Sequence, residues 1–505
     1  TAYMNRIFLT FFALCMFSDT VSAQIQRTYH WYFGNGAGID FSSGTAVAVT
    51  DGNFYAEEGC SAISDNDGNL LFYTNGDSVM NKNHQRMPNG FDLMGCWSST
   101  QTVLIVPLPN NEYLYYIFTV DGWDGSGGVE CNDYQNGFRY SVVDMSLEGG
   151  LGDVTLKNQL IHAPSTEQLA ATFHANCTDI WLMTHDLTET KFYAYLVTSE
   201  GIDMNPVVSN IGDPNIPLFN GWYNGAAGCF KFSPNGRKFC AVRFFGDTGF
   251  PNNFNTLEIY DFDNNTGLLS NIIGLSKSLN IYGASFSPDN SKLFISIPKQ
   301  YIYQYDLSSD DSATIVNSLT LIATSNDDDT TGTTWYCAMQ IGADRRIYVA
   351  RWRDNLPADT IPIINNPNEA GINCSFVYKG IGLSGKESKE GFPNFIETFF
   401  DTNNDCFQPR DTIKQEMLYI PSIFSPNNDG VNDILYVRGI GINQIQFAIY
   451  NRWGELIFES NDINFGWDGT YKGIQLQSAV FVFHIYVVFE NGKQMIKSGN
   501  VTLLR

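Results

Sequence analysis

The chain has 505 residues, of which 43% are hydrophobic and 14% aromatic, and its 53 acidic against 29 basic side chains give a formal net charge of -24. This apolar content excludes a mainly disordered chain, and the length corresponds to about three domains, or to one large β-structure with a smaller one. The negative charge argues against nucleic acid and against an anionic membrane surface as partners, because both require a basic footprint.

Residues 1–23 are typical of a secretory signal peptide whose true start is Met4. Arg6 supplies a basic region, residues 7–17 form an apolar run too short to span a bilayer, and a small-residue cleavage site ends at Ala23. No later segment reaches the roughly 18 consecutive apolar residues of a membrane helix. The sequence therefore predicts an exported chain that begins at Gln24 and has no transmembrane segment.

The cysteines fit an exported protein. Ten are present, and removal of Cys15 with the signal peptide leaves nine, so at least one thiol is unpaired or bonds to another molecule. Cys229 and Cys240 lie almost symmetrically about the turn 233–236, which makes them the candidate disulfide of a β-hairpin. No C-x-x-C pair or Cys/His cluster with zinc spacing occurs, which argues against a structural zinc site.

A repeated hairpin pattern dominates residues 24–400. Residues 230–239 recur as 284–294 and more loosely as 339–348, with spacings of 54 and 55 residues, and weaker copies lie upstream. A hairpin with a following strand, repeated along the chain, is the signature of propeller blades. The 377 residues divided by seven give about 54 per blade, so an all-β fold with a seven-bladed β-propeller is expected, with six or eight blades as alternatives. The seventh blade would pair residues 391–396 with the strand 28–33.

The end of the chain differs in composition. Residues 401–418 are polar and interrupted by Pro409, and we interpret them as a linker. Residues 419–505 contain about seven short strand patterns, which predict a small Ig-like β-sandwich. This module carries a net charge of -1, whereas residues 24–418 carry -23.

Four motifs make residues 419–505 resemble the type B sorting domain of the Bacteroidota type IX secretion system, also called the gliding-motility-associated C-terminal domain. They are F-S-P-N-N-D-G-V-N-D from Phe424, I-Y-N-R-W-G from Ile449, W-D-G-T from Trp467 and K-S-G-N-V-T-L-L-R from Lys497. The resemblance implies that the following residues form the sorting motif: Phe424, Pro426, Asn427, Asp429, Gly430, Asn432, Asp433, Tyr450, Asn451, Arg452, Trp453, Gly454, Trp467, Asp468, Gly469, Lys497, Gly499 and Arg505.

The first domain resembles the uncharacterised propeller that often precedes this module. The likeness lies in residues 31–41, 68–76 and 98–101. Together the two resemblances imply type IX secretion after Sec-type export, an extracellular or outer-cell-surface location, and contact with the secretion and surface-attachment machinery. They imply no known chemistry for the propeller.

One loop of the sorting motif is a candidate calcium site. Asn427, Asp429, Asn432 and Asp433 offer the oxygen ligands that Ca²⁺ prefers, with Gly430 at the tight turn. The alternative is a network of Asx turns in which the same side chains bind backbone amides. The sequence predicts no other cofactor.

Candidate catalytic groups are few, and we assign no catalytic residue. His174 and His185 flank a hairpin that contains Asp179, but residues of this kind more often fix a turn, and no nucleophile elbow or H-E-x-x-H motif accompanies them. Glu57-Glu58 and Glu130 lie in loops between blade strands, where a carboxylate pair would suit glycoside cleavage. Solvated acids remain the alternative.

The tryptophans near blade loops suggest a binding face. Trp97, Trp123, Trp222 and Trp335 are candidates for stacking on sugar rings or on a protein ligand, unless they pack between blades. The preferred interpretation is a secreted or surface-attached protein whose propeller binds or adheres to a glycan or a surface protein. The alternatives are a polysaccharide hydrolase or lyase with carboxylates in the propeller funnel, and a structural component of a surface filament.

Overall fold

We describe a computed structural model of the chain. It describes residues 24–123, 131–213, 216–219, 222–244, 256–277, 279–298, 301–325, 334–353, 356–401, 417–421, 423–427, 432–440, 442–463, 465–489 and 494–505. The predicted signal peptide lies outside these residues. The chain divides into two compact units, Thr1–Phe407 and Gln408–Arg505. Within the described ranges, none of the helices has the length and apolar character needed to cross a membrane.

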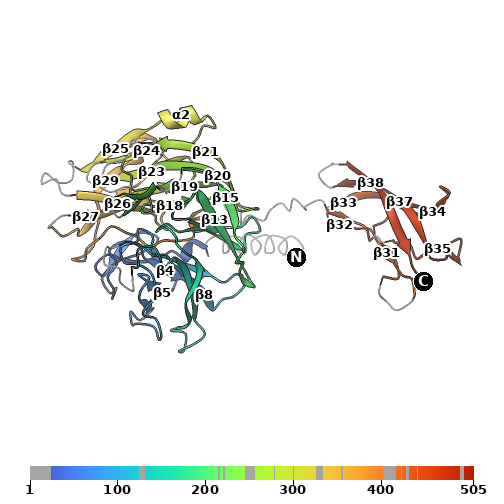
Figure 1. Cartoon of the computed structure of the whole chain (residues 1–505), viewed down its shortest axis with the longest axis horizontal. Coiled ribbons are helices and arrows are strands. Elements are labelled where there is room, and N and C mark those ends of the chain that lie inside the picture. The colour runs from blue at the N-terminus through green and yellow to red at the C-terminus, as the bar shows by residue number, and fades with distance from the viewer. Residues whose placement is uncertain are drawn as a thin grey trace, which may run out of the picture. The chain divides into compact units, whose positions relative to one another are not determined.

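Seven antiparallel sheets of three to five strands make up the described part of the first unit (Figure 1). In chain order the sheets are β1 (His30–Phe33), β2 (Ala37–Asp40) and β3 (Val47–Val49); β4 (Ser61–Ser64), β5 (Leu70–Thr74) and β6 (Val79–Asn81); β7 (Val103–Pro107), β8 (Leu114–Thr119), β9 (Phe138–Asp144) and β10 (Asp153–His162); β11 (Ala170–Phe173), β12 (Ile180–His185), β13 (Lys191–Thr198), β14 (Gly201–Ile202) and β15 (Val207–Asn210); β18 (Phe230–Phe232), β19 (Lys238–Val242), β20 (Leu257–Asp263) and β21 (Leu268–Ser276); β22 (Gly283–Phe286), β23 (Lys292–Ile297), β24 (Tyr301–Asp306) and β25 (Thr320–Thr324); and β26 (Thr334–Ile341), β27 (Ile347–Arg353), β28 (Thr360–Ile364) and β29 (Phe376–Gly382).

Smaller elements complete this unit. A two-stranded sheet, the helix α2 and two 3-10 turns lie between or after the larger sheets: β16 (Ile216–Phe219), β17 (Trp222–Asn224), α2 (Ser312–Asn317), η2 (Gly371–Cys374) and η3 (Glu397–Phe400).

The repeated sequence produces a repeated turn. In the β18–β19 hairpin the Ser233 amide donates to the Lys238 carbonyl at 2.9 Å, and the Ser233 hydroxyl accepts from the Lys238 amide. In the β22–β23 hairpin Ser287 makes the same two bonds with Lys292. In both hairpins the serine binds the lysine through its backbone amide and its hydroxyl, which explains why the same residues recur at these positions. The predicted hairpins are confirmed.

The sheets form a ring. The first strands of neighbouring sheets contact each other, as β4 does β7, β18 does β22 and β22 does β26, while β29 of the last sheet reaches β3 of the first. Buried apolar clusters cross from one sheet to the next, so each blade covers the face of its neighbour. The all-β fold class with a seven-bladed propeller is confirmed.

The predicted closure of the ring is wrong in its pairing. In the described residues β1 pairs with β2, and residues 391–396 make no ladder with it. These residues form backbone bridges with Cys60 before β4 and with Ala171 in β11 instead. Apolar packing joins them to the first blade, where Phe392 packs on Phe33 at 4.8 Å between ring centroids.

Residues 391–400 therefore lie in the central channel. They contact β4, β11 and β18, which belong to three different blades, and Glu397 forms an ion pair with Lys231 of β18. Pro393 cannot donate to a ladder, and the buried partner of Glu397 lies across the channel, so this segment fills the axis and does not extend a sheet.

The candidate disulfide is also wrong. Cys229 and Cys240 are free and buried. The register pairs Cys240 with Lys231, and the Val242 amide donates to the Cys229 carbonyl. The two cysteines are thus diagonal neighbours and do not face each other. They would be opposite only if the hairpin turned about residues 234–235, whereas the observed register centres the turn one residue later. The expected unpaired thiols are present: five described cysteines are free.

The second unit is a small all-β structure with a mixed sheet. Its strands are β30 (Met417–Tyr419), β31 (Ile423–Phe424), β32 (Arg438–Ile440), β33 (Ile442–Tyr450), β34 (Leu456–Ser460), β35 (Thr470–Tyr471), β36 (Ile474–Gln475), β37 (Ala479–Phe489) and β38 (Gln494–Leu503). The main sheet has the order β31-β38-β37-β33-β34, and two-stranded sheets pair β30 with β32 and β35 with β36. Because β31 is parallel to β38, the main sheet departs from the antiparallel sheets of an Ig sandwich.

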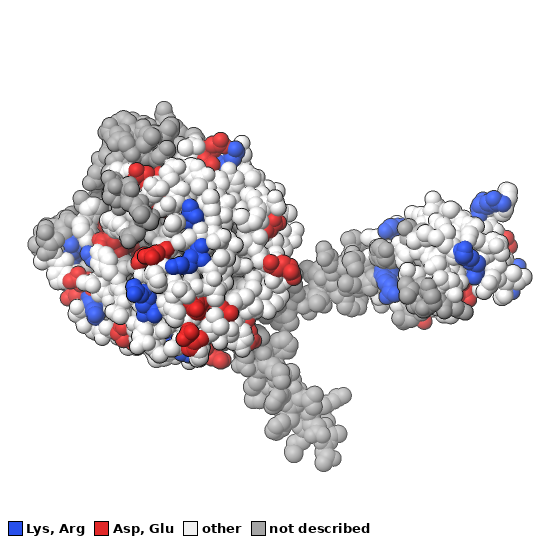
Figure 2. Space-filling model, turned by 60° about the horizontal axis from the view of Figure 1, so that its bottom comes forward, with Lys and Arg blue, Asp and Glu red and all other residues white. Residues whose placement is uncertain are grey.

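Charged side chains are dispersed over one face of the propeller. On the face drawn in Figure 2, acidic and basic side chains alternate on a mostly uncharged surface. The large net charge of the first unit is therefore not gathered into one acidic patch on that face.

Candidate functional site

The first strand of each blade lies next to the central channel, and these inner strands all begin at the same end of it. Each inner strand is reached from the outer edge of the preceding blade, so the residues just before β4, β11 and β22 gather at one end. They include Glu58, Glu167 and Tyr282, and Glu390 enters the channel beside them. Tyr134, from the connection between β8 and β9, joins them. We call these five residues the funnel mouth.

Backbone contacts fix two of the carboxylates next to each other. The Glu390 amide donates to the Glu57 carbonyl at 2.9 Å. A Cβ added at Gly391 would lie 1.7 Å from the Glu58 carbonyl oxygen, so only glycine permits this approach. The side chains of Glu58 and Glu390 consequently start from touching segments.

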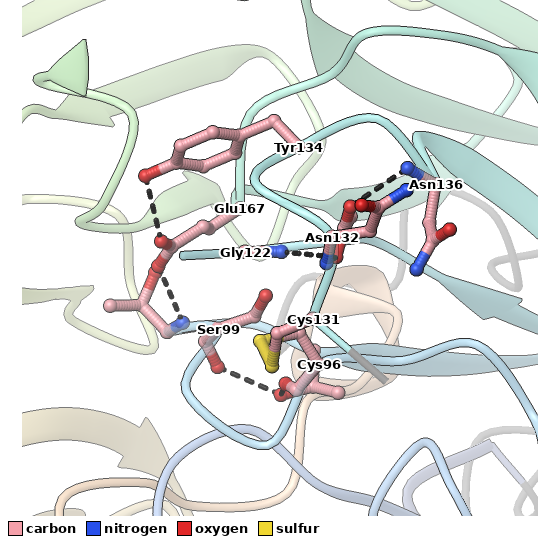
Figure 3. The surroundings of a disulfide bond; sticks show 11 residues. Cys96, Ser99, Gly122, Cys131, Asn132, Tyr134, Asn136 and Glu167 are labelled. Carbon is pink, nitrogen blue, oxygen red and sulfur yellow. Dashed lines mark hydrogen bonds between the residues drawn. A yellow bond between two sulfur atoms is a disulfide. The ribbon is translucent and has the colours of Figure 1, made fainter. Parts of the chain in front are cut away.

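Glu167 is held by two donors near a disulfide (Figure 3). Its carboxylate accepts from the Thr100 amide at 3.1 Å and from the Tyr134 hydroxyl at 3.2 Å. The disulfide between Cys96 and Cys131 joins the connection that carries Tyr134 to the start of the same blade. Burial raises the pKa of Glu167 to about 7, because the loss of hydration outweighs these hydrogen bonds.

Glu58 and Glu390 face Tyr282. Burial, with neighbouring carboxylates adding to it, raises the pKa of Glu58 well above its usual range and that of Glu390 to about 7. The Tyr282 hydroxyl is close enough to affect both carboxyl groups, but it has no partner at hydrogen-bond distance among the described residues. The covered Oε2 atom of Glu58 also lacks such a partner.

A small cavity adjoins the mouth; Thr100, Tyr282 and Lys231 belong to its lining, whereas Glu58, Glu167 and Glu390 do not. The space open to water centres is about 30 Å³, and a water needs about 10 to 15 Å³, so roughly two waters fit. In its lining, Lys231 binds Glu397 at 2.6 Å and also donates to Gln340. The channel is therefore filled beyond its mouth, and the carboxylates are reached from one end.

Stability is expected to depend on pH through Glu167. The unfolded carboxyl has a pKa of about 4.3, while the folded one titrates at about 7. The folded state thus binds the proton more tightly, so the contribution of Glu167 to stability is present at low pH and is lost as the pH rises from about 4.3 to 7.

Urea unfolding of the protein and of Glu167→Gln at pH 5, 6, 7 and 8 tests this. The difference in free energy of unfolding, wild type minus variant, should fall with rising pH and level off above about 7. Taking the difference removes the contribution of the histidines. A difference that stays constant or rises would contradict the raised pKa.

The structure separates the histidines of the sequence analysis. His174 lies in the β11–β12 turn, where its Nδ1 accepts from the Asn176 amide, whereas His185 lies at the other end of β12. Asn176 also donates to Asp179 at 2.7 Å. His174 and Asp179 therefore fix a turn, as the alternative interpretation held.

The predicted acidic residues have different surroundings. Glu57 is 3.7 Å from Lys389, and Glu58 is part of the funnel mouth. Glu130 lies outside the described residues. Glu167 and Glu390 were not among the sequence candidates. The signal for Glu167 was present, because the segment 165–168 repeats the pattern of 98–101. Gln101 accepts from the Leu169 amide and Gln168 donates to the Ala227 carbonyl, so each glutamine binds backbone at the start of the next blade.

The tryptophans divide into packed and exposed ones. Trp335 packs edge-on against Trp352 at 5.2 Å, and Trp123 packs with Tyr134. Trp97 is 50% exposed and follows Cys96 at the mouth end of the propeller. The side chain of Trp222 lies outside the described residues. Trp97 is thus the aromatic placed to meet a ligand.

In the second unit the C-terminal arginine joins three motif segments. Arg505 donates to the Pro426 carbonyl at 3.2 Å, to the Gly469 carbonyl at 3.3 Å and to the Leu476 carbonyl at 2.7 Å. Trp467 is fully buried against Phe424 at 5.3 Å, and Asp468 accepts from the Thr470 amide. Sequence blocks far apart in the chain therefore form one corner of the unit.

The N-R-W-G block forms the exposed tip of the β33–β34 hairpin. Asn451 accepts from the amides of Trp453 and Glu455, and Gly454 has a positive φ of 78° that suits the turn. Trp453 is 80% exposed, with the Arg452 guanidinium 5.0 Å from its ring. A turn that orders an exposed tryptophan and arginine presents side chains suited to recognition. Tyr450 ends β33, half-buried.

Some of the remaining motif residues lie in the main sheet, and others are outside the described residues. Lys497 is exposed on β38, and a Cβ at Gly499 would lie 2.7 Å from the Phe483 ring. Asp429 and Gly430 are outside the described residues, while the Asn432 carbonyl accepts from the Ser425 amide at 3.0 Å. Calcium binding at Asn427, Asp429, Asn432 and Asp433 therefore stays a prediction. Within the described ranges, no group of three acidic, histidine or cysteine side chains is arranged to hold a metal ion.

Comparison with known proteins characterises the second unit. Residues 418–503 match the family model described as the CHU_C Type IX secretion signal domain. No curated protein matches the chain.

Several solved structures are distantly similar to the chain. They include Kuenenia stuttgartiensis hydrazine synthase, at 10% identity and a TM-score of 0.37 over 65% of this chain and 96% of that one. Dihydro-heme d1 dehydrogenase NirN in complex with DHE has 11% identity and a TM-score of 0.38 over 86% and 73%. Kluyveromyces lactis Hsv2 has 9% identity and a TM-score of 0.34 over 67% and 90%. We base no inference on these low scores.

Proposed function

We propose that the propeller is a binding or adhesion module. Residues 418–503, a type IX secretion signal domain, direct it to the cell surface or outside the cell. The observation that supports this proposal is the funnel mouth. Side chains from several blades converge at one end of a channel that is filled further along, and two of their polar atoms lack a partner in the described residues. Such convergent polar groups in a concave site are typical of ligand binding.

Trp97 provides the test of the binding face. The purified full-length protein is applied to arrays of bacterial and host glycans and of cell-surface proteins. Trp97→Ala should weaken binding at least about fivefold, because exposed tryptophans at interfaces commonly contribute more than 1 kcal/mol. The matched control is Tyr113→Ala, which removes an aromatic ring that is 55% exposed at the opposite end of the channel. Binding to no array member, or equal weakening by both changes, would contradict the proposal.

A second function is favoured by one observation, the pKa of about 7 for Glu167 and Glu390. A carboxyl group with such a value can act as a general acid, and glycoside hydrolysis requires one such acid together with a second, ionised carboxylate. A polysaccharide hydrolase or lyase would release oligosaccharides from the glycans of the same array. Glu167→Gln should then abolish product release while leaving the protein folded.

A further inference from the structure

In the described residues, the carboxylates of the funnel mouth do not form the ion pairs that other buried acids of the propeller form, although the charge of Lys389 acts on Glu390. Glu397 pairs with Lys231 at 2.6 Å, and Glu258 pairs with Arg243 at 2.6 Å. No lysine or arginine of the described residues forms an ion pair with Glu58, Glu167 or Glu390, although Glu167 is only 3% exposed. Removing an unpaired charge from water costs several kcal/mol, so a positive group that entered the mouth would be strongly stabilised.

The geometry favours an ammonium group over a metal ion. The described residues contain no cluster of three metal-ligating side chains. Glu58 and Glu390 lie side by side, and between them the Tyr282 hydroxyl and the Glu58 Oε2 atom have no hydrogen-bond partner in the described residues. Tyr282 is 5% exposed, so water reaches its hydroxyl poorly. Two carboxylates and one hydroxyl oxygen supply three acceptors, which match the three N–H donors of a primary ammonium.

The depth of the acceptors limits what carries the ammonium. Tyr282 is 5% exposed, and Glu58 and Glu390 are half-buried. An ammonium at the end of an unbranched alkyl chain, as in lysine, reaches such acceptors more easily than an amine attached directly to a sugar ring. The acidic first domain, with a net charge of -23 over residues 24–418, also attracts basic proteins over long range.

We propose that the funnel mouth binds the ammonium group of a lysine side chain presented by a basic partner protein, with Glu58, Glu390 and Tyr282 as its acceptors. This inference rests on the proposed binding function and names the chemistry of its ligand.

Nα-acetyl-lysine N-methylamide is the probe, and titration calorimetry with the full-length protein at pH 8 is the measurement. At that pH the lysine remains protonated, while Glu390, whose pKa is about 7, is largely ionised. We expect saturable binding at one site. The uncharged norleucine analogue should not bind, and the trimethyl-lysine analogue, which has no N–H donors, should bind at least about tenfold more weakly.

The variants separate this site from general acidity. Glu58→Gln and Glu390→Gln should each weaken binding at least about tenfold, since a charge-assisted hydrogen bond contributes about 1.5 to 3 kcal/mol. Glu112→Gln, an exposed acid at the opposite end of the channel, should have no effect. Tyr282→Phe removes only the hydroxyl acceptor. It should also weaken binding of the lysine probe, and it replaces a Gln variant that fails to fold. Equal binding by all variants, or binding of glucosamine but not of the lysine probe, would overturn the proposal.

The two proposals fail differently. If array binding depends on Trp97 but the partners lack exposed lysines and bind Glu58→Gln normally, the binding function stands and the ammonium site is wrong. If the lysine probe binds as expected but no array member does, the ammonium site stands and the adhesion function is wrong.

Discussion

Replacing Glu397 by alanine is expected to lower the free energy of unfolding of the propeller by about 3 to 5 kcal/mol, because the change leaves a buried cation without its partner. Lys231 is 6% exposed and Glu397 3% exposed, and their atoms are 2.6 Å apart in the channel. Gln340 accepts a further hydrogen bond from Lys231. Denaturant unfolding followed by circular dichroism measures the loss.

An exposed pair on a neighbouring strand is the control. Lys238 and Asp261 are 2.7 Å apart, but their side chains are 35% and 40% exposed. Asp261→Ala should cost less than about 1 kcal/mol, because water solvates the remaining charge. The double change Lys231→Met with Glu397→Leu should recover most of the lost stability, since it removes both charges. Equal losses for Glu397→Ala and Asp261→Ala would show that the channel pair is not dehydrated.

Replacing Trp467 by alanine is expected to destabilise the second unit by about 3 to 5 kcal/mol. The ring is fully buried, packs on Phe481 at 4.8 Å between centroids, and donates its Nε1 proton to the Thr470 carbonyl at 2.9 Å. Removing it leaves a cavity at the centre of the small core and an unpaired carbonyl. Limited proteolysis and thermal unfolding of the second unit in the full chain measure this loss.

Trp453 offers a matched control of the same residue type. It is 80% exposed, so Trp453→Ala should change stability by no more than about 0.5 kcal/mol. Secretion in the native host should nevertheless be impaired by this change. The folded Trp453→Ala chain should accumulate in the periplasm, because the ordered Arg452–Trp453 tip is lost. Protease accessibility on intact cells measures delivery. Normal surface delivery of Trp453→Ala would show that secretion is specified by another part of the unit.

Much of this architecture could be predicted because it depends on local sequence. Ser233 and Ser287 close equivalent turns with neighbouring residues, so the letters that repeat are those that determine the hairpin. The signal domain was predictable for a similar reason. Its blocks encode turns and a buried tryptophan, as Asn451 and Trp467 illustrate, and each block can be read separately.

What the sequence could not show depends on which residues meet across the ring. Glu58, Glu167 and Glu390 are up to 332 positions apart, and only the closed ring of blades brings them to one end of the channel. Cys96 meets Cys131 because the connection between β8 and β9 folds back to the start of its own blade, whereas the nearly symmetric Cys229 and Cys240 are separated by the register of their hairpin. Residues 391–400 resemble another blade strand, yet the Lys231 partner of Glu397 places them in the channel.

The sequence by itself thus determined the all-β class, the repeated blades and the secretion domain, since periodic patterns and turn residues act over short distances in the chain. The tertiary structure alone decided the funnel mouth, the disulfide and the filling of the channel. Burial and charge pairing act through space, and a carboxylate that looks solvated in the sequence is dehydrated once several blades surround it.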